Sequence, residues 1–113
     1  MSARLLSSDV VAAALQHEPL PVEDLIDGEP TAASTPLDSL GGVEIGIWEM
    51  TVGGARDTEV DEVFIVVSGR GTVRFDDGEE LALSPGVAVR LSAGEQTSWT
   101  VHETLRKVYI APE

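Results

Sequence analysis

From Val43 onward, the chain alternates apolar and polar residues in short segments separated by turn residues. Because successive side chains of a β-strand point to opposite faces, such alternation indicates strands with one buried face. Several short strands in succession are typical of a sandwich or barrel. We predict seven strands, at residues 43–52, 61–68, 71–76, 80–84, 88–92, 96–101 and 105–111. The chain is therefore expected to be an all-β protein.

Turn residues separate the predicted strands. Asp77 and Gly78 indicate a tight hairpin, because glycine tolerates the positive φ that such turns require. Residues 84–86 and 93–95 are further turns, and we interpret the glycine-containing segments 52–55 and 69–71 as short turns between strands. No strand–helix–strand alternation is visible, which disfavours a parallel α/β sheet.

The first 42 residues show a different pattern. Residues 7–17 predict a short helix, with serines for capping, Asp9 in the first turn and Pro19 as a stop. Residues 19–42 lack helical periodicity and are rich in Pro, Asp, Glu, Thr and Gly, which predicts an extended, irregular arm. We therefore divide the chain into residues 1–42, a helix and arm packing on the barrel, and residues 43–113, the β-barrel itself.

Size and charge restrict the classes of function. At 113 residues the chain has room for one domain and one core. It contains no cysteine, which excludes thiolate catalysis and zinc sites built on sulfur. The 20 acidic and 7 basic residues give a formal charge of −13, so neither nucleic acid nor a membrane is expected as a partner of this acidic protein. The N-terminus lacks the pattern of a secretory signal, which predicts a cytoplasmic protein.

Several short motifs follow one another at informative distances. Glu62 is followed by Gly69, the Pro85-Gly86 turn and then Ala93-Gly94. In this order and spacing they resemble the two motifs of the cupin superfamily. Trp99 and the segment 105–109 resemble more narrowly the small cupins related to ureidoglycine aminohydrolase and the ethanolamine-utilisation cupins. The resemblance covers residues 43–110 and implies a cupin-type jelly-roll β-barrel, a fold that hosts many activities.

The resemblance also implies a metal site, which this sequence does not supply. Metal-binding cupins carry two histidines shortly before the glutamate and a third after the second turn. Here the corresponding positions fall within residues 55–58 and at Thr97, so Glu62 alone remains of the usual ligands. One carboxylate is too few to hold a transition metal. We therefore expect neither a metal nor another cofactor.

The other possible ligands do not change this expectation. His17 lies in the arm, and strand alternation points His102 away from the interior, so we assign both to the surface or to a dimer contact. Asp57, Glu59 and Asp61 could offer oxygen ligands to a divalent cation, but a solvated acidic turn is the preferred interpretation.

The candidate site is built around Glu62. If this residue points into the barrel, as the resemblance implies, alternation places Phe64 on the same inner face and Trp99 faces inward from another strand. A carboxylate among apolar walls needs a cation or a donor, and Arg56 is the nearest candidate, with Lys107 as the alternative. We predict Glu62 as the catalytic residue. The predicted ligand-binding residues are Trp48, Arg56, Thr58, Phe64, Thr97, Trp99, Lys107 and Tyr109.

The two tryptophans and the tyrosine each have two interpretations. Trp48 and Trp99 serve either as core residues or as flat walls that stack a sugar or a planar nitrogenous ligand. Tyr109 shares a strand face with Lys107, and it is either a donor at the pocket rim or a packed aromatic residue.

Three functional hypotheses remain open. The first is a metal-independent small-molecule pocket that binds or transforms a small polar metabolite through Glu62. The second is a metal-dependent cupin enzyme acting on a C–N bond of a small ureido or amino compound. The third is a non-catalytic dimeric scaffold, because the apolar face expected of residues 43–52 suits pairing with a second copy. A homodimer is expected on the same grounds.

Overall fold

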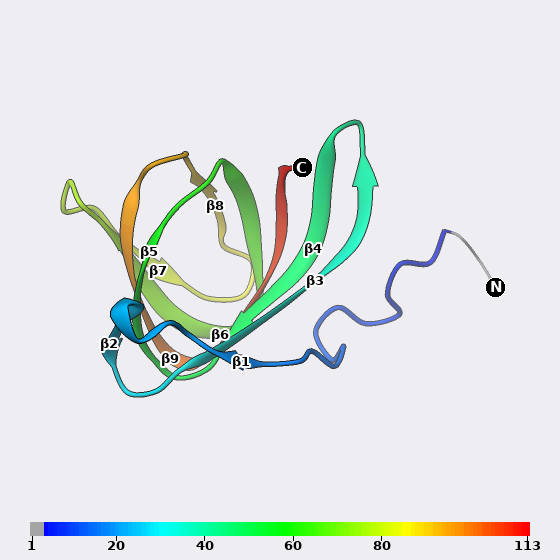
Figure 1. Cartoon of the computed structure of the whole chain (residues 1–113). Coiled ribbons are helices and arrows are strands. Elements are labelled where there is room, and N and C mark those ends of the chain that lie inside the picture. Colours follow the sequence, from blue (N-terminus) through cyan, green and yellow to red (C-terminus); the bar gives the residue numbers. More distant parts are fainter. Residues whose placement is uncertain (1–3) are drawn as a thin grey trace.

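The computed structural model describes residues 4–113, and over this range the protein is built of β-strands with no α-helix (Figure 1). The strands are β1 (Glu18–Pro19), β2 (Leu25–Asp27), β3 (Thr31–Leu40), β4 (Val43–Met50), β5 (Gly53–Thr58), β6 (Glu62–Phe75), β7 (Glu80–Leu83), β8 (Ala88–Leu91) and β9 (Gln96–Pro112). A 3-10 helix, η1 (Val22–Asp24), lies between β1 and β2. The predicted all-β class is confirmed.

The strands of the described chain form one curled antiparallel sheet organised around β9. β9 pairs with β4 and β5 along one edge and with β6 along the other, and β6 also pairs with β7 and β8. β6 and β9 each run without a break through a region that the sequence analysis divides into two strands. Figure 1 shows how these long strands bend, so that the sheet closes toward itself as a barrel.

The segment 69–71, predicted as a turn, is instead a bulged part of β6. The pairing of β6 with β9 shifts register between Val66 and Gly71. Gly69 has φ +89, and a Cβ at this position would collide with the carbonyl oxygen of Thr104 and lie 2.7 Å from the Cα of Leu105. Only glycine combines this backbone conformation with so close an approach of the neighbouring strand, so the strand bends and continues. The segment 52–55 was also predicted as a turn, and its last three residues belong to β5.

The helix predicted at residues 7–17 is wrong. Only a single turn forms there: the Asp9 carboxylate accepts hydrogen bonds from the amides of Val11 and Ala12 at 2.9 and 3.2 Å, and the Ala13 amide donates to the Asp9 carbonyl at 3.0 Å. The Arg106 guanidinium also donates a hydrogen bond to the Ala13 carbonyl at 2.7 Å. Short helices gain little from their own hydrogen bonds, so this contact with the sheet decides the local structure.

The predicted irregular arm at residues 19–42 is extended, but much of it belongs to the sheet. β3 pairs with β4 from Ala32↔Met50 to Leu40↔Val43, with an irregularity between Pro36 and Asp38. A proline and a bulge on the outermost long strand weaken the alternation that marks a strand, and both are common at sheet edges. The β3–β4 hairpin crosses the proposed boundary at residue 42, and that division stays a prediction.

The core lies inside the curled sheet. Its largest fully buried side chains within the core cluster are those of Phe64, Met50, Leu91, Leu105, Val66 and Val73. They come from strands β4, β6, β8 and β9, and each is almost or completely inaccessible.

Candidate functional site

Glu62 and Lys107 form an ion pair inside the sheet. Glu62 is the first residue of β6, and alternation along this strand places it on the same face as the fully buried Phe64. The Lys107 ammonium donates to Glu62 Oε2 at 2.6 Å, and the side chains of Lys107 and Glu62 are only 6% and 12% exposed. Of the two partners that the sequence analysis considered, the structure therefore pairs Glu62 with Lys107 and not with Arg56.

Three aromatic rings surround the Lys107 ammonium. Its nitrogen lies 4.3 Å from the centroid of Phe64, 4.6 Å from that of Trp48 and 4.9 Å from that of Trp99. The rings also contact one another, with centroids 5.6 Å apart for Trp48 and Trp99 and 5.7 Å apart for Phe64 and Trp99. We call these three residues the aromatic cage. A ring face attracts a cation, so the cage and Glu62 together replace the water that burial removes from the ammonium.

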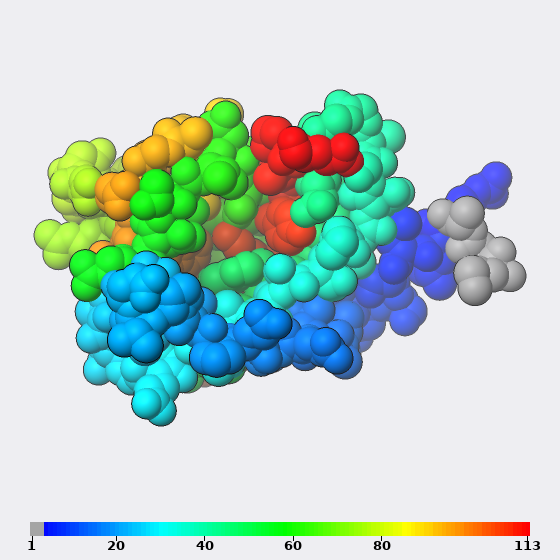
Figure 2. Space-filling model, in the orientation of Figure 1, coloured from blue at the N-terminus to red at the C-terminus, as the bar shows by residue number. Residues whose placement is uncertain are grey.

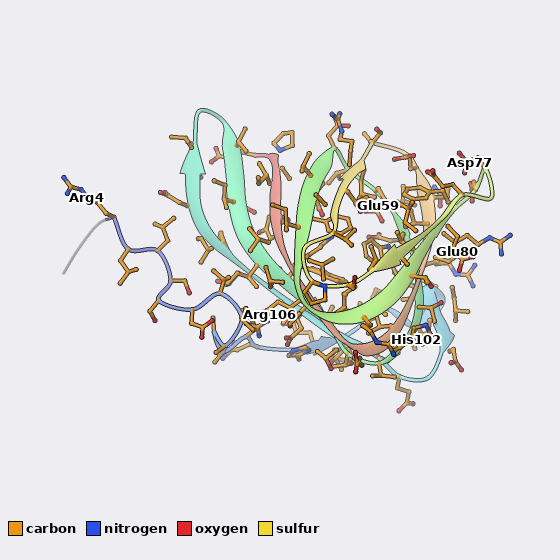
Figure 3. The ribbon with its side chains drawn as sticks, turned by 180° about the vertical axis from the view of Figure 1, so that it is seen from behind. Arg4, Glu59, Asp77, Glu80, His102 and Arg106 are labelled. Atoms are coloured by element: carbon orange, nitrogen blue, oxygen red, sulfur yellow. The ribbon has the colours of Figure 1, made fainter. Side chains whose placement is uncertain are left out.

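A second carboxylate, Glu59, is buried on another side of the cage. The hydroxyl of Thr97 donates to Glu59 Oε2 at 2.6 Å, and the indole nitrogen of Trp99 donates to the same oxygen at 3.1 Å. The solvated acidic turn predicted for Glu59 is wrong, because the residue is only 7% exposed. Residue 59 lies outside the strands, so no alternation could reveal its direction. Figure 3 shows Glu59 within the curl of the sheet.

Asp57 lies near Glu59 at the mouth of the barrel. It belongs to β5, opposite the inward-facing Thr97, and keeps access to solvent. Partial burial raises its pKa to about 6, and the charge of Glu59 adds to the rise, while Lys107 acts in the opposite direction. A carboxyl group with this pKa can gain or lose a proton near neutral pH.

Tyr109 follows Lys107 on the inner face of β9. Its hydroxyl donates to Glu44 Oε2 at 2.7 Å. Burial raises the pKa of Tyr109 to about 12, and the negative charges of Glu44 and Glu62 contribute to this rise. A Cβ at Gly46 would collide with the Tyr109 ring and hydroxyl, so the glycine makes room for this side chain. The phenol therefore acts as a fixed hydrogen-bond donor near the Glu62–Lys107 pair.

The structure brings most of the predicted site residues together but separates two of them. Trp48, Phe64, Thr97, Trp99, Lys107 and Tyr109 gather with Glu62 through the contacts above. Arg56 and Thr58 alternate to the outer side of β5, where both are exposed and the Thr58 hydroxyl donates to Gln96 Oε1 at 3.1 Å. β5 is not among the predicted strands, and without that strand the direction of the Arg56 and Thr58 side chains could not be assigned.

Glu62 also opens onto a pocket at the edge of the barrel. This rim pocket has a volume of about 250 Å³ and is lined by Val43, Asp61, Glu62, Val63, Arg90, Ile110, Ala111 and Pro112. No described residue donates a hydrogen bond to Glu62 Oε1, and no buried side-chain oxygen or nitrogen within residues 4–113 lacks a partner. Oε1 is therefore accessible, while Oε2 is held by Lys107. Figure 2 shows the molecule hollowed at its centre, with atoms of β9 deep in the recess.

The described residues do not fit a transition metal. They contain no group of three or more His, Asp or Glu side chains arranged to hold an ion. His17 lies on the N-terminal segment, where its ring nitrogens contact Thr31 Oγ1 at 2.9 Å and Glu49 Oε2 at 2.6 Å. His102 is exposed on the outside of the sheet (Figure 3). Near Glu62, the cation that the structure provides is the ammonium of Lys107.

Comparison with known proteins identifies the fold. The family model described as the EutQ-like cupin domain matches residues 37–109. The structure is similar to the EutQ protein of Clostridium difficile, with TM-score 0.65, 21% identity and coverage of 80% of this chain and 76% of that one. It is also similar to a protein of unknown function from Pseudomonas syringae pv. tomato, with TM-score 0.76, 24% identity and coverage of 90% and 45%.

Ectoine synthase from P. lautus is a further structural neighbour, with TM-score 0.64, 20% identity and coverage of 79% of this chain and 68% of that one. At such identities the likeness shows the fold alone. No curated protein matches the chain in sequence. The cupin-type barrel and the resemblance to the ethanolamine-utilisation cupins are confirmed. No helix within residues 4–113 is long and apolar enough to cross a membrane.

Proposed function

Because the chain belongs to the EutQ-like cupin domain family, we propose that it binds or transforms a small polar metabolite at the rim pocket, through Glu62 and without a transition metal. The observation that carries this proposal is that the two carboxylate oxygens of Glu62 have different surroundings. Oε2 is fixed by Lys107 at 2.6 Å, Oε1 has no hydrogen-bond donor among the described residues, and Glu62 lines a pocket of about 250 Å³.

The lining of the rim pocket limits the chemistry of its ligand. Five of its residues are apolar, namely Val43, Val63, Ile110, Ala111 and Pro112. The polar groups are Glu62 and the exposed pair of Asp61 and Arg90, whose charged atoms lie 3.8 Å apart. A ligand with a compact apolar part and one hydroxyl or amine donor would match this arrangement, with its donor directed at Oε1.

The aromatic cage supports the proposed role of Glu62 indirectly. Its rings surround the Lys107 ammonium, and this ammonium forms the ion pair with Glu62. The cage and the buried position of Lys107 restrict the ammonium to one place, so the carboxylate has a defined orientation without help from a ligand. Preorganised groups of this kind lose little entropy on binding. A carboxylate so placed can accept the proton of a bound hydroxyl or amine. Two structural neighbours are named as enzymes, an ectoine synthase and a DMSP lyase.

The test is a screen of small metabolites by ligand-observed NMR, followed by measurement of each binder with Glu62→Gln. Glutamine keeps an acceptor for Lys107 but removes the charge, so we expect affinity to fall by about tenfold or more. Glu80→Gln is the control, because Glu80 is an exposed carboxylate on the β6–β7 hairpin (Figure 3).

Two results would contradict the proposal. One is binding that Glu62→Gln leaves as strong as Glu80→Gln does. The other is a stoichiometric transition metal in protein purified from its host, which would favour the metal-dependent hypothesis. If no metabolite binds, the dimeric scaffold is favoured instead.

A further inference from the structure

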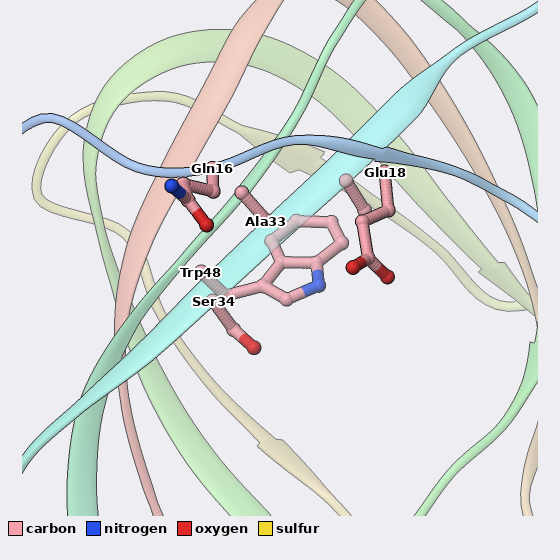
Figure 4. Close-up of a pocket in the computed structure, with 6 residues that line it drawn as sticks. Gln16, Glu18, Ala33, Ser34 and Trp48 are labelled. Carbon is pink, nitrogen blue, oxygen red and sulfur yellow. The ribbon is translucent and has the colours of Figure 1, made fainter.

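A second pocket lies between the N-terminal segment and the edge of the sheet. It has a volume of about 320 Å³ and is lined by Gln16, Glu18, Ala32, Ala33, Ser34 and Trp48, and we call it the arm pocket (Figure 4). It shares no lining residue with the rim pocket. Trp48 connects it to the interior, because the same indole forms part of the aromatic cage.

The wall contributed by the N-terminal segment is fixed in place. Glu18 pairs with Ala32 in the short β1–β3 ladder. His17, between the two lining residues of this segment, is held by Thr31 and by Glu49 at 2.6 Å. Figure 4 shows the side chains of Gln16 and Glu18 reaching from this segment on either side of the Trp48 ring. The pocket therefore exists before a ligand arrives.

The charges of the arm pocket favour a cation. Among its six lining residues Glu18 is charged and none is basic. Gln16 and Ser34 add neutral hydrogen-bonding groups, and the indole of Trp48 adds an electron-rich ring. A protein of formal charge −13 also attracts cations and repels anions at long range. An anionic ligand would find no compensating charge here.

The interior of the same protein shows how this combination holds an ammonium group. There the Lys107 ammonium lies 4.6 Å from the Trp48 centroid and 2.6 Å from a carboxylate oxygen of Glu62. The arm pocket offers the same indole together with another carboxylate, that of Glu18. Because aromatic rings and carboxylates attract organic cations wherever water is partly excluded, the same pairing can serve a free ligand.

We propose that the arm pocket binds a small organic cation, a primary or methylated ammonium compound, between Trp48 and Glu18. Gln16 and Ser34 hydrogen-bond to a hydroxyl or carbonyl group of the ligand. The pocket therefore prefers such a ligand to a simple alkylamine, which lacks this group. The volume of the pocket is at the lower end of the range for small-molecule sites and suits a compact ligand.

The experiment is a titration of the folded protein with choline, followed by NMR. The two indole N–H signals are assigned with Trp48→Phe, so that Trp99 serves as an internal reference. The neutral carbon isostere dimethylbutanol is titrated in parallel. Glu18→Gln is compared with Glu23→Gln, an exposed carboxylate outside the pocket with the same change of charge.

We expect choline to shift the Trp48 indole signal saturably and dimethylbutanol to leave it unchanged. Glu18→Gln should weaken choline binding by about three- to fivefold, since one exposed carboxylate contributes modestly, and Glu23→Gln should not. Added salt should weaken binding too. The proposal is overturned by no saturable shift at Trp48, by equal binding of the neutral isostere, or by equal effects of the two variants. Shifts confined to the amides of Val63 and Ile110 would place the cation in the rim pocket and also overturn it.

Discussion

Among single residues, Asp57 shows most clearly how the mouth of the barrel affects acid–base chemistry. Burial and the neighbouring charge of Glu59 raise its pKa from 3.8 to about 6. We predict that NMR titration of the Asp57 carboxyl will give a value near this one, and that Glu59→Gln will lower it. A pKa close to 3.8 in the unmodified protein would contradict the geometry of the Asp57 and Glu59 side chains.

The same shift predicts how stability depends on pH. A carboxyl whose pKa is higher in the folded than in the unfolded protein stabilises the folded state while it is protonated. This contribution is present below the ordinary value of 3.8 and is lost as pH rises through about 6. Asp57→Asn should therefore increase the free energy of unfolding at neutral pH, with a smaller gain near pH 4, as urea denaturation can measure. An Asn variant less stable at neutral pH would contradict this explanation.

Alternation along single strands predicted the inward direction of several site residues but not their partners. It correctly placed Phe64 and Trp99 in the interior and His102 outside. The partner of Glu62 depends on the pairing of β6 with β9, which places Val66 opposite Lys107 and shifts register immediately afterwards. A bulge of this kind results from contacts between strands far apart in sequence, and local patterns do not encode it.

At the scale of whole elements, the bulge in β6 depends on Gly69. We predict that Gly69→Ala will lower the free energy of unfolding by more than about 2 kcal/mol, because the added Cβ collides with backbone of β9 and the residue has positive φ. Gly78→Ala is the matched control. Its φ is also positive, +93, but a Cβ there meets nothing within 4 Å, so a loss of about 1 kcal/mol is expected. Equal losses in urea denaturation would contradict the collision.

The N-terminal segment is attached to the sheet by charged groups. Glu49 accepts from Arg106 at 2.9 Å and contacts His17, while Arg106 donates to the carbonyls of Val10 and Ala13. Burial of Glu49 alone would raise its pKa, but its bonds to Arg106 and His17 outweigh burial and lower it. The resulting stabilisation is present above the ordinary value of 4.5 and is lost as pH falls through the lowered pKa.

We therefore predict that Glu49→Gln will loosen the segment at neutral pH, because it weakens the bonds to both His17 and Arg106. Cleavage by chymotrypsin after Leu15 should become faster, as followed by mass spectrometry. Glu103→Gln is the control, since Glu103 pairs with Arg70 at the exposed surface, where ion pairs contribute little. If both variants are cleaved as slowly as the unmodified protein, the segment is held by something other than this cluster.

The N-terminal elements show why the sequence predicted strands better than helices in this chain. Strands β4 and β8 are close to their predicted ranges, because alternation reports burial on one face of a sheet. The helix predicted at residues 7–17 does not form. Arg106, more than 90 residues further along, binds the Val10 and Ala13 carbonyls, which a helix would use for its own hydrogen bonds. β3 was missed because it is an outer strand with few buried residues.

On the scale of the whole molecule, an apolar surface crosses the outer side of β6 and β9. Val63, Ile65 and Ile110 are 39%, 42% and 37% exposed, and Val63 pairs directly with Ile110. Apolar residues grouped in this way are typical of an interface. The homodimer expected from the sequence stays a prediction. We propose this surface as its interface in place of the face of residues 43–52, and its Val63 and Ile110 also line the rim pocket.

Light scattering after size-exclusion chromatography tests this prediction. We expect the unmodified protein to have the mass of a dimer and Ile65→Glu to have that of a monomer, because two new charges would face each other in the interface. Val22→Glu is the control, since Val22 is 81% exposed but lies on η1, away from this surface. A monomeric unmodified protein, or an Ile65→Glu variant that remains dimeric, would contradict the assignment.

The most direct test of the central claim is a double-mutant cycle on the Glu62–Lys107 pair, with the free energy of unfolding measured by urea denaturation. If the pair is buried as described, Lys107→Met alone should cost about 3–5 kcal/mol, because it leaves Glu62 uncompensated. Glu62→Gln combined with Lys107→Met should restore much of that loss. Strictly additive effects of the two substitutions would show that the side chains do not interact, and would contradict the site built on them.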